Sequence, residues 1–485
     1  MPRNRALLDW IKVERNAATP LNIQISEQLR EAIRTGRLPP GTALPSSRAL
    51  AANLSIARGT ATAIYDRLIG EGWLDVRERS AIVVADTLGV RSAVKTSFTS
   101  VSSFDALREA IRSDEGLPPP YAAFLPGIPA FDIFPASTWV RLLSARSRNL
   151  SMDLAGEGIH IGGYPALRAA LAEHLKTARG VLCESHQIIV TSSARAALTA
   201  ICRFLANPGD RCLVEDPGYP IAHRIIVNCG LEAVPIPVDV DGMRVEPQLT
   251  SARLAYLTPT HQLPLGVSLS ASRGEMLIDW AKRENAWIIE DDYDSEFRYS
   301  GRPVVALQHL DPDGQVIYIG TFAKTMFPSL RVGFLVVPER LARDAAIAIH
   351  LSGQEPTLHV QAALADFIAQ GHYVTHIRRA RTIYRRRQRL LIDALNKHLD
   401  GILSVPEMAG GMNLLMPLPP QISAVRVQEL AARVQIHARA VSYYALKAEP
   451  PNALHLGFAP LSDGLIEPAA IKLAGVIRSI SAGPL

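Results

Sequence analysis

The feature that most restricts the fold of this chain is an alternation, beyond residue 121, of short apolar runs with longer helical patterns. Five runs have the length and apolar content of buried strands: residues 187–190, 211–214, 253–257, 287–290 and 316–319. Strands that alternate with helices form a mostly parallel sheet covered by helices. Because ligands bind beyond the carboxyl ends of the strands in such sheets, the loop after each run is where we look for chemistry.

A different pattern precedes this alternation, in residues 20–86. Apolar residues recur at helical spacing in a predicted first helix, at Leu21, Ile25, Leu29 and Ile33. Two further helices are expected, one beginning at Ser46 or Ser47 and one running from about Arg58 to Ile69. Residues 73–77 and 82–84 predict the two strands of a hairpin. Three helices followed by a hairpin form a winged helix.

Residues 87–120 separate the two patterns. They are rich in Ser, Thr and charged residues, contain one candidate short helix at residues 104–111, and end in three prolines. A segment of this length is too long for a simple connection within a compact domain, so it indicates a linker. The sequence therefore predicts a first domain at residues 1–86, a linker at 87–120 and a second domain at 121–485.

Composition excludes some classes and leaves others open. The net charge of +5 over 485 residues does not by itself establish nucleic-acid binding. The four cysteines form no CxxC pair and lie near no histidine cluster, so we expect buried free thiols and no metal site. The first residues lack the apolar core of a signal peptide, and no run of about 18 apolar residues follows. We expect a cytoplasmic protein.

The helix-turn-helix segment carries specific sequence signals. The stretch that begins Leu44-Pro-Ser-Ser-Arg-Ala-Leu and ends at Leu68, followed by Glu71-Gly-Trp-Leu, resembles the GntR-type winged helix-turn-helix over residues 20–86. The N-terminal end of the third helix of such domains enters the major groove. We therefore expect Arg58 to read a base, with Thr60 and Thr62 beside it. The expected phosphate contacts are Ser46, Ser47 and Arg48 at the start of the second helix, and Arg77 beside the wing.

An alternative remains open for this domain. Residues 1–86 contain twelve Lys or Arg and nine Asp or Glu, a net charge of only +3, so DNA binding is expected to depend on a dimer. These charges can instead form the solvated face of a protein-binding winged helix. Two positions also depart from the usual pattern, because Ala57 replaces a capping serine and Ala81 stands where a wing glycine is common.

Four loops after predicted strands carry groups suited to a flat, phosphorylated ligand. Residues 190–198 join a strand to a helix, whose free backbone amides form a phosphate site. Tyr219, in the segment Glu215-Asp-Pro-Gly-Tyr, stands where an aromatic ring can cover a flat cofactor. Residues 258–266 add polar groups at the same edge. Asp291 follows an apolar run and is placed to pair with a pyridinium nitrogen.

The fifth loop has the strongest pattern, Gly320-Thr-Phe-Ala-Lys-Thr-Met-Phe-Pro-Ser-Leu-Arg-Val-Gly. Lys324 can form a Schiff base with an aldehyde. Thr321 and Arg331 flank it with a hydroxyl and a guanidinium suited to a phosphate group. Each residue alone has an ordinary alternative, such as a surface lysine, a capping aspartate or a core tyrosine. Their occurrence together, at successive strand ends, indicates a cofactor site.

In this order the five loops resemble the type I aminotransferase fold as found in the MocR/GabR family of transcriptional regulators, over roughly residues 121–480. The resemblance implies an α/β fold with a mostly parallel sheet and a smaller C-terminal α+β subdomain. It implies pyridoxal 5'-phosphate (PLP) as the cofactor, with Lys324 as the Schiff-base lysine, Asp291 on the ring nitrogen, Tyr293 on the ring hydroxyl and Tyr219 stacked on the ring. The residues implied around the phosphate are Ser193, Ala194, Arg195, Thr321 and Arg331.

Some positions depart from the aminotransferase pattern. Ser193 and Arg195 occupy places where Gly and Gln are usual, although the backbone amides of that loop remain. In the segment Leu454-His-Leu-Gly-Phe-Ala, aminotransferases commonly have an arginine that binds the substrate carboxylate, and this chain has His455. His455 is therefore the candidate effector contact. Either another arginine binds a carboxylate, or the effector is PLP itself, a sulfonate or a cyclic amino compound.

The leading hypothesis is a homodimeric regulator that binds double-stranded operator DNA and senses a small amine or amino-acid-related effector through an aldimine with PLP. Any transaminase activity is then vestigial. One alternative is an active aminotransferase with an appended DNA-binding domain, since Lys324 and Asp291 are groups that transamination needs. Another is a regulator whose second domain no longer holds PLP, against which the intact Lys324 argues.

Overall fold

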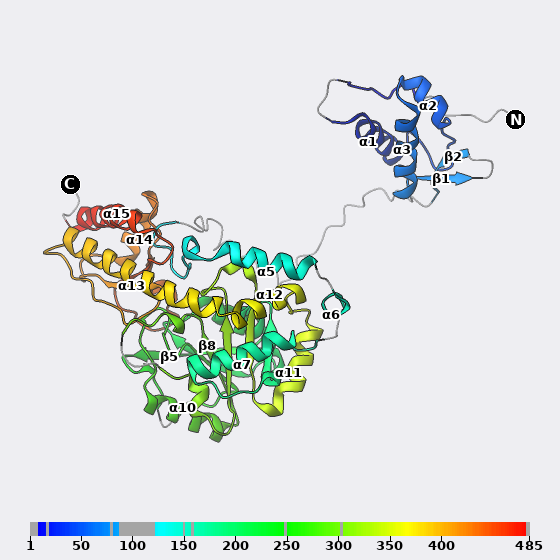
Figure 1. The fold of residues 1–485 in the computed structure, drawn as a ribbon. Helices are drawn as coiled ribbons and strands as arrows, with labels where there is room; N and C mark the ends of the chain where they lie inside the picture. Colours follow the sequence, from blue (N-terminus) through cyan, green and yellow to red (C-terminus); the bar gives the residue numbers. More distant parts are fainter. Residues whose placement is uncertain are drawn as a thin grey trace. The chain divides into compact units, whose positions relative to one another are not determined.

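A computed structural model describes residues 8–15, 19–77, 81–86, 122–148, 151–156, 160–246, 250–300 and 304–481 of the chain. The chain forms two compact units, Met1–Glu115 and Gly116–Leu485 (Figure 1). The division between them falls inside the segment predicted as a linker. That linker, with its candidate helix at 104–111, lies outside the described residues.

The first unit contains the three helices and the hairpin that the sequence predicts. Their bounds are α1 (Leu21–Arg34), α2 (Ser47–Leu54), α3 (Arg58–Gly70), β1 (Leu74–Arg77) and β2 (Ala81–Val84). The two strands pair antiparallel, with Leu74 opposite Val84. One apolar cluster joins the helices, and its fully buried members include Ile25, Leu29, Leu50 and Ile64. This core holds the N-terminal ends of α2 and α3 in place.

The second unit is built on one large sheet. Its strands are β3 (Ile188–Thr191), β4 (Arg211–Asp216), β5 (Glu232–Asp239), β6 (Gly242–Met243), β7 (Leu254–Leu257), β8 (Trp287–Asp292), β9 (Val316–Thr321) and β10 (Gly333–Val336). Their order is β3-β10-β9-β8-β7-β4-β5-β6. The five predicted runs are β3, β4, β7, β8 and β9, and all but β3 belong to the continuous parallel part.

Three strands of this sheet were not predicted from the sequence. Strand β5 contains Pro235 and Pro237, which interrupt a strand pattern, and β6 and β10 are short. Strand β10 runs antiparallel to both β9 and β3, and β6 runs antiparallel to β5. The sheet is therefore mixed, with a parallel centre at which the carboxyl ends of four predicted strands meet.

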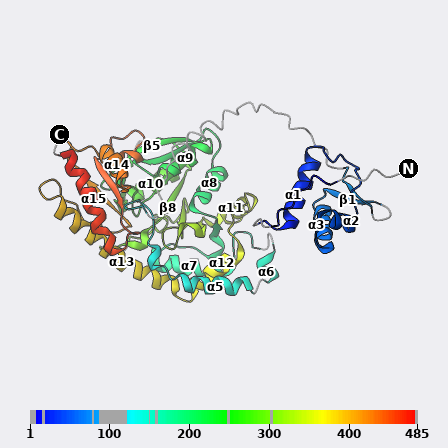
Figure 2. The same cartoon turned by 90° about the horizontal axis from the view of Figure 1, so that it is seen from above.

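Helices cover both faces of the sheet because its side chains alternate between two cores. Ile317 and Ile319 pack in one core with residues of α8 and α11, whereas Tyr318 packs in the other with residues of α7 and α12. Figure 2 shows β8 between α9 and α10 on one side and α7 and α12 on the other. The helices are α5 (Ala136–Arg148), α6 (Met152–Ala155), α7 (Pro165–Arg179), α8 (Ala194–Leu205), α9 (Pro220–Asn228), α10 (Ala271–Glu284), α11 (Glu339–Leu351) and α12 (Leu358–Ala369).

A C-terminal α+β subdomain completes the second unit. It contains a three-stranded antiparallel sheet, in the order β11-β13-β12, and three helices. Their bounds are α13 (His372–His398), β11 (Asn413–Pro417), α14 (Ala424–Arg433), β12 (Arg439–Ala440), β13 (Ala453–Gly457) and α15 (Asp463–Ser481). No helix in the described part of the chain is long and apolar enough to cross a membrane.

Hydrogen bonds fasten this subdomain to the end of β4. The carboxylate of Asp216 accepts hydrogen bonds from the backbone amides of Leu446, Lys447 and Ala448, each at 2.7 Å. The amide of Gly218 donates to the carbonyl of Tyr444 at 3.0 Å. The loop before β13 is thereby held over the carboxyl edge of the large sheet.

A buried ion pair connects α7 with the end of β8. The Arg179 guanidinium donates to Asp292 at 2.7 Å, and the side chains of the two residues are 6% and 3% exposed. Asp292 also accepts hydrogen bonds from the hydroxyls of Tyr318 and Ser295, each at 2.7 Å. Asp292 is therefore the carboxylate that pairs directly with the buried charge of Arg179.

We expect Asp292→Ala to lower the free energy of unfolding of the second unit by about 3–5 kcal/mol, because it leaves Arg179 buried without its carboxylate partner. Urea unfolding followed by tryptophan fluorescence measures this. The matched control is Asp279→Ala, which removes an exposed carboxylate 3.9 Å from Lys282 and should cost no more than about 1 kcal/mol. Equal losses in the two variants would contradict the role given to the buried pair.

Candidate functional site

A cavity of about 490 Å³ lies at the carboxyl edge of the large sheet. Every residue that the sequence implied for the cofactor lines it: Ser193, Ala194, Arg195, Tyr219, Asp291, Tyr293, Thr321, Lys324 and Arg331. His455 of the C-terminal subdomain lines the same cavity. Since these residues come from the carboxyl ends of β8 and β9, from segments that follow β3, β4, β8 and β9, and from β13, the fold brings together groups that are far apart in the sequence.

Lys324, three residues after β9, is held in the cavity by a backbone contact. Its Nζ donates a hydrogen bond to the carbonyl oxygen of Gly127 at 2.5 Å. A Cβ atom on Gly127, whose φ is +77°, would lie 3.0 Å from that Nζ. Burial, together with the nearby charge of Arg195, lowers the pKa of Lys324 to about 8. A sizeable fraction of the amine is therefore neutral near neutral pH, as a nucleophile for an aldehyde must be.

Asp291, on the neighbouring strand β8, presents a free acceptor. One carboxylate oxygen, Oδ2, accepts a hydrogen bond from the Tyr256 hydroxyl at 2.5 Å. The other, Oδ1, is buried and has no hydrogen-bond partner among the described residues. Burial raises the pKa of this carboxyl to about 6. A buried acceptor without a partner is costly, and a protonated pyridine nitrogen would satisfy it.

The loop between β3 and α8 has the geometry of a phosphate site. Ser193 caps α8 by accepting a hydrogen bond from the Ala196 amide at 3.1 Å. The helix therefore begins at the cavity with the amides of its first turn directed there. A Cβ atom on Gly333 of β10 would lie 2.7 Å from the Ala194 nitrogen, so only glycine permits this close approach of strand and loop. Arg195 and Arg331 line the cavity at this loop and add positive charge.

Two tyrosines, Tyr219 and Tyr293, line the part of the cavity in which the pyridoxal ring is expected. Tyr219 is the residue before α9, and Tyr293 follows the end of β8. The Tyr293 hydroxyl donates to the carbonyl oxygen of His261 at 2.9 Å, which fixes its ring at the cavity wall. Together with Asp291 and Lys324, these side chains match the donor set that a pyridoxal ring requires. The residues present therefore fit the cofactor.

His455 does not present a cation to the cavity. It is 3% exposed, and its Nδ1 lies 2.8 Å from the Tyr444 hydroxyl. Burial, reinforced by the charge of His261, lowers the pKa of His455 to about 3, so the ring is neutral at physiological pH. The pH dependence expected from the sequence for a histidine here consequently falls far below neutrality.

An arginine that the sequence did not single out lies next to His455. Arg439 is opposite His455 in the pairing of β12 with β13 and lines the same cavity. Its guanidinium stacks over the Tyr443 ring, 4.7 Å from the ring centroid, and within the described residues it has no carboxylate partner. The segment before Arg439 carries no recognisable motif, so only strand pairing reveals this position.

Other contributors were also missed. Tyr256 orients Asp291 from within a strand that the sequence predicts only as apolar. Asn413 of β11 accepts a hydrogen bond from the Gly127 amide at 2.8 Å, and so joins the subdomain to the segment that touches Lys324. These two contacts depend on distant elements meeting, which no local pattern shows.

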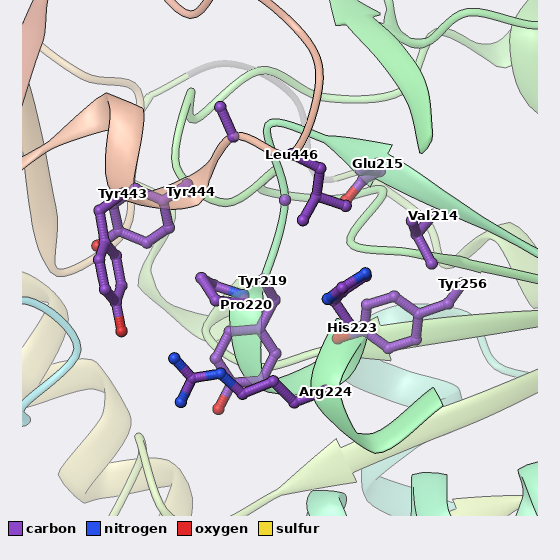
Figure 3. A pocket seen from close by; sticks show the side chains of 12 residues that line it. Val214, Glu215, Tyr219, Pro220, His223, Arg224, Tyr256, Tyr443, Tyr444 and Leu446 are labelled. Carbon is purple, nitrogen blue, oxygen red and sulfur yellow. The ribbon is translucent and has the colours of Figure 1, made fainter. Parts of the chain in front are cut away.

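A smaller cavity of about 180 Å³ adjoins the first. Figure 3 shows Tyr219 and Pro220 across from Tyr443 and Tyr444, which project from the C-terminal subdomain. These four residues line both cavities. One side of the candidate site is therefore formed by the subdomain, beside the loop that Asp216 holds.

The residues expected to contact DNA lie at the exposed starts of two helices and beside the wing. Ser46 caps α2 by accepting a hydrogen bond from the Ala49 amide at 3.2 Å, and Ser47 and Arg48 follow in its first turn. Arg58 is the first residue of α3 and is exposed, as is Thr62, whereas Thr60 is half-buried. Ala57, before α3, makes no side-chain cap, and Arg77 is exposed at the end of β1.

Each of the two units matches a known protein family. Residues 21–84 match the family of bacterial regulatory proteins called gntR, and residues 139–473 match aminotransferase class I and II. The probable rhizopine catabolism regulatory protein MocR of Rhizobium meliloti is 41% identical over 83% of each chain. The pyridoxine biosynthesis regulator PdxR of Corynebacterium glutamicum is 33% identical over 91% of this chain and 92% of its own.

Solved structures that resemble the second unit include aminotransferases. The kynurenine aminotransferase of Pyrococcus horikoshii, in complex with PMP, superposes with a TM-score of 0.68 at 25% identity and covers 79% of this chain and 97% of its own. The fold and the site thus define a DNA-binding transcriptional regulator whose second unit is a PLP-binding domain of aminotransferase fold. The chain belongs to the MocR family of GntR-type regulators. The predicted fold class, family and cofactor are confirmed.

We expect Asp291→Ala to weaken PLP binding by about 10- to 100-fold, since a hydrogen bond to a charged group contributes about 1.5–3 kcal/mol. Titration of the apoprotein with PLP, followed by visible absorbance, measures the dissociation constant. Asp279→Ala, an exposed carboxylate on α10, is the matched control. An Asp291→Ala variant that binds PLP as tightly as this control would show that the free Oδ1 does not face the ring nitrogen.

Proposed function

We propose that this regulator senses a small amine or an amino-acid-related compound, which reacts at the PLP site and thereby changes operator affinity. The observation that supports this most directly is the buried Lys324 amine beside the unpartnered Oδ1 of Asp291, in a chain that also carries a winged helix. An effector changes DNA binding only if it binds two conformations of the protein with different affinities.

The site residues have separate roles in this proposal. PLP, when bound, supplies an aldehyde and an electron-withdrawing ring. Lys324 would bind the aldehyde carbon, and Asp291 would hold the proton on the ring nitrogen. Tyr293, whose own proton goes to the carbonyl oxygen of His261, would accept a hydrogen bond from the ring hydroxyl, and Tyr219 would cover the ring. The phosphate is held by the first-turn amides of α8 with Ser193, Ala194, Arg195, Thr321 and Arg331.

The first unit, for which we propose the bounds 1–86, contacts operator DNA. We propose that Arg58 reads a base in the major groove, with Thr60 and Thr62 beside it. Arg48, Arg77 and the start of α2 at Ser46 and Ser47 contact phosphates. We further propose a homodimer, because helix-turn-helix domains read two half-sites and a net charge of +3 over residues 1–86 favours paired domains. We propose that this homodimer acts in the cytoplasm.

The effector's acidic group, where it has one, binds Arg439 in our proposal. Neutral His455 cannot compensate a carboxylate, whereas Arg439 is a cation without a carboxylate partner on the adjacent strand. His455 and Tyr444 then supply neutral polar contacts. The names of the relatives, a rhizopine catabolism regulator and a pyridoxine biosynthesis regulator, agree with effectors other than ordinary α-amino acids.

We expect Lys324→Ala to abolish the visible band of lysine-bound PLP and the response to effector, while basal DNA binding is retained. Absorbance spectra with and without PLP, borohydride reduction and mapping of the modified lysine test the first part. DNA binding measured by fluorescence anisotropy tests the second, with Lys282→Ala, a surface lysine, as the control. A wild-type protein that turned over an amine and a keto acid at enzyme-like rates would favour the aminotransferase alternative instead.

We expect Arg439→Gln to weaken binding of amines that carry a carboxylate or sulfonate by about 10- to 100-fold, because a charge-assisted hydrogen bond is lost. Neutral amines should bind the variant and the wild type equally. Spectral titration of PLP-loaded protein with a matched panel of anionic and neutral amines measures both. Equal binding of every anionic amine to the two proteins would remove Arg439 from the effector site.

A further inference from the structure

Positive charge in this chain is concentrated on one helix. Helix α13 contains eight Lys or Arg residues and one acidic residue, Asp393, a net charge of +7 within residues 372–398. The whole chain has a net charge of +5, so the remaining residues together are negative by two. The small net charge of the chain therefore coexists with a strongly positive local charge on α13.

The arginines of α13 lie opposite its packed face. One face is buried and includes Tyr373, Ile377, Tyr384 and Leu391. Arg378, Arg379, Arg381 and Arg385 are exposed. At 1.5 Å per residue, Arg378 and Arg385 are two helical turns apart, about 10 Å along the same side of the helix. In both Figure 1 and Figure 2, α13 lies at the edge of the second unit.

Part of this charge is already compensated within the protein. Arg386 and Arg387 pair with Asp463, Arg387 also pairs with Asp132, and Arg389 lies 3.6 Å from Glu407. These bonds fasten the middle of α13 to the subdomain and to η2 (Phe131–Ile133). They explain why several of its arginines are present without any external partner.

The exposed arginines in the N-terminal half of the helix differ from these, because their charges have no acidic partner within the described residues. The side chains of Arg378, Arg379 and Arg385 make no hydrogen bond or ion pair within the described residues. Arg381 donates to the backbone carbonyl of Glu296 at 3.0 Å and 2.8 Å, which leaves its charge without a carboxylate partner. Four like charges on the outer face of one helix repel one another, and an anionic surface bound to them would relieve this repulsion.

Duplex DNA is an anionic surface that the first unit already binds. It carries about one negative charge per 1.7 Å of helix axis, in rows that match a line of exposed arginines. The winged-helix residues 1–86 contribute a net charge of only +3. Thirty-five residues separate Asp86 from Ala122, enough chain to span about 100 Å when extended, so both units can reach one DNA molecule.

We propose that the exposed arginines in the N-terminal half of α13, Arg378, Arg379, Arg381 and Arg385, form a second DNA-contacting surface that binds backbone phosphates without reading sequence. The winged helix selects the operator, and α13 holds the flanking duplex. This surface belongs to the same unit as the PLP site.

The test is a triple variant of the full-length, PLP-loaded protein, Arg378→Gln with Arg379→Gln and Arg385→Gln. Binding to a labelled mixed-sequence duplex of about 40 base pairs is measured by fluorescence anisotropy between about 50 and 200 mM KCl. Since each lost phosphate contact makes the slope of log K against log salt less negative by about 0.9, the slope should change by up to about 2.7 per protomer. Affinity at low salt should fall at least tenfold.

The matched control removes the same charge from three other exposed arginines, on α10, α11 and α14, whose side chains make no ion pair within the described residues: Arg283→Gln with Arg343→Gln and Arg433→Gln. The control should keep most of the wild-type slope. Equal slopes in the two triple variants would mean that only net charge matters, and would overturn the proposal. An unchanged slope in the α13 variant would also overturn it, and would indicate a solvated face or an acidic protein partner.

Folding and cofactor binding are checked in the same samples. Both triple variants should keep the visible PLP band and the unfolding temperature of the wild type, because none of the six residues lies in the cavity wall. If the triple variant is unstable, single Arg378→Gln and Arg385→Gln variants should each change the slope by about 0.9. Loss of the PLP band in wild-type protein would contradict the cofactor role without affecting this DNA test.

Discussion

The burial of Lys324 and Asp291 at the ends of adjacent parallel strands is the constraint on which the rest of the second unit depends. Burial lowers the pKa of the amine to about 8 and raises that of the carboxyl to about 6, so both groups are poised near neutrality. Tyr256 and Gly127 hold one atom of each group and leave Oδ1 of Asp291 for an outside partner. A ring that bears an aldehyde and a protonated nitrogen satisfies both groups at once.

The C-terminal subdomain forms the part of the cavity to which we assign effector binding. Asp216 and Asn413 fasten the subdomain to the sheet edge and to the segment beside Lys324. Once it is fastened, β12 and β13 bring Arg439 and neutral His455 to the same cavity. The usual position of the carboxylate-binding arginine is thus occupied by a buried, uncharged ring. The positive charge has moved to the neighbouring strand, which changes where an acidic group can lie relative to the reacting amine.

The arginines of α13 fall into two groups, those that form ion pairs within the protein and those that do not. Most arginines of the middle of α13 pair with Asp132, Asp463 or Glu407 and stabilise packing. The exposed arginines in the N-terminal half of α13 have no such partners. Neither the winged helix nor the total composition suggests a strongly basic protein. A small net charge therefore conceals a local surface of the kind that a long polyanion recognises, since screening limits each charge to its neighbourhood.

The sequence by itself determined the winged helix, five strands of the large sheet with the loops that follow them, and the residues that these loops bring to the carboxyl edge. Helical and strand periodicity are local, and the ends of parallel strands must converge, so Lys324, Asp291 and Tyr219 were predictable from their positions after apolar runs. Only the tertiary structure decided the antiparallel strand β10, the bond from Tyr256 to Asp291 and the place of Arg439. These depend on pairing between segments distant in the chain, and on burial that makes His455 neutral. No local pattern contains that information.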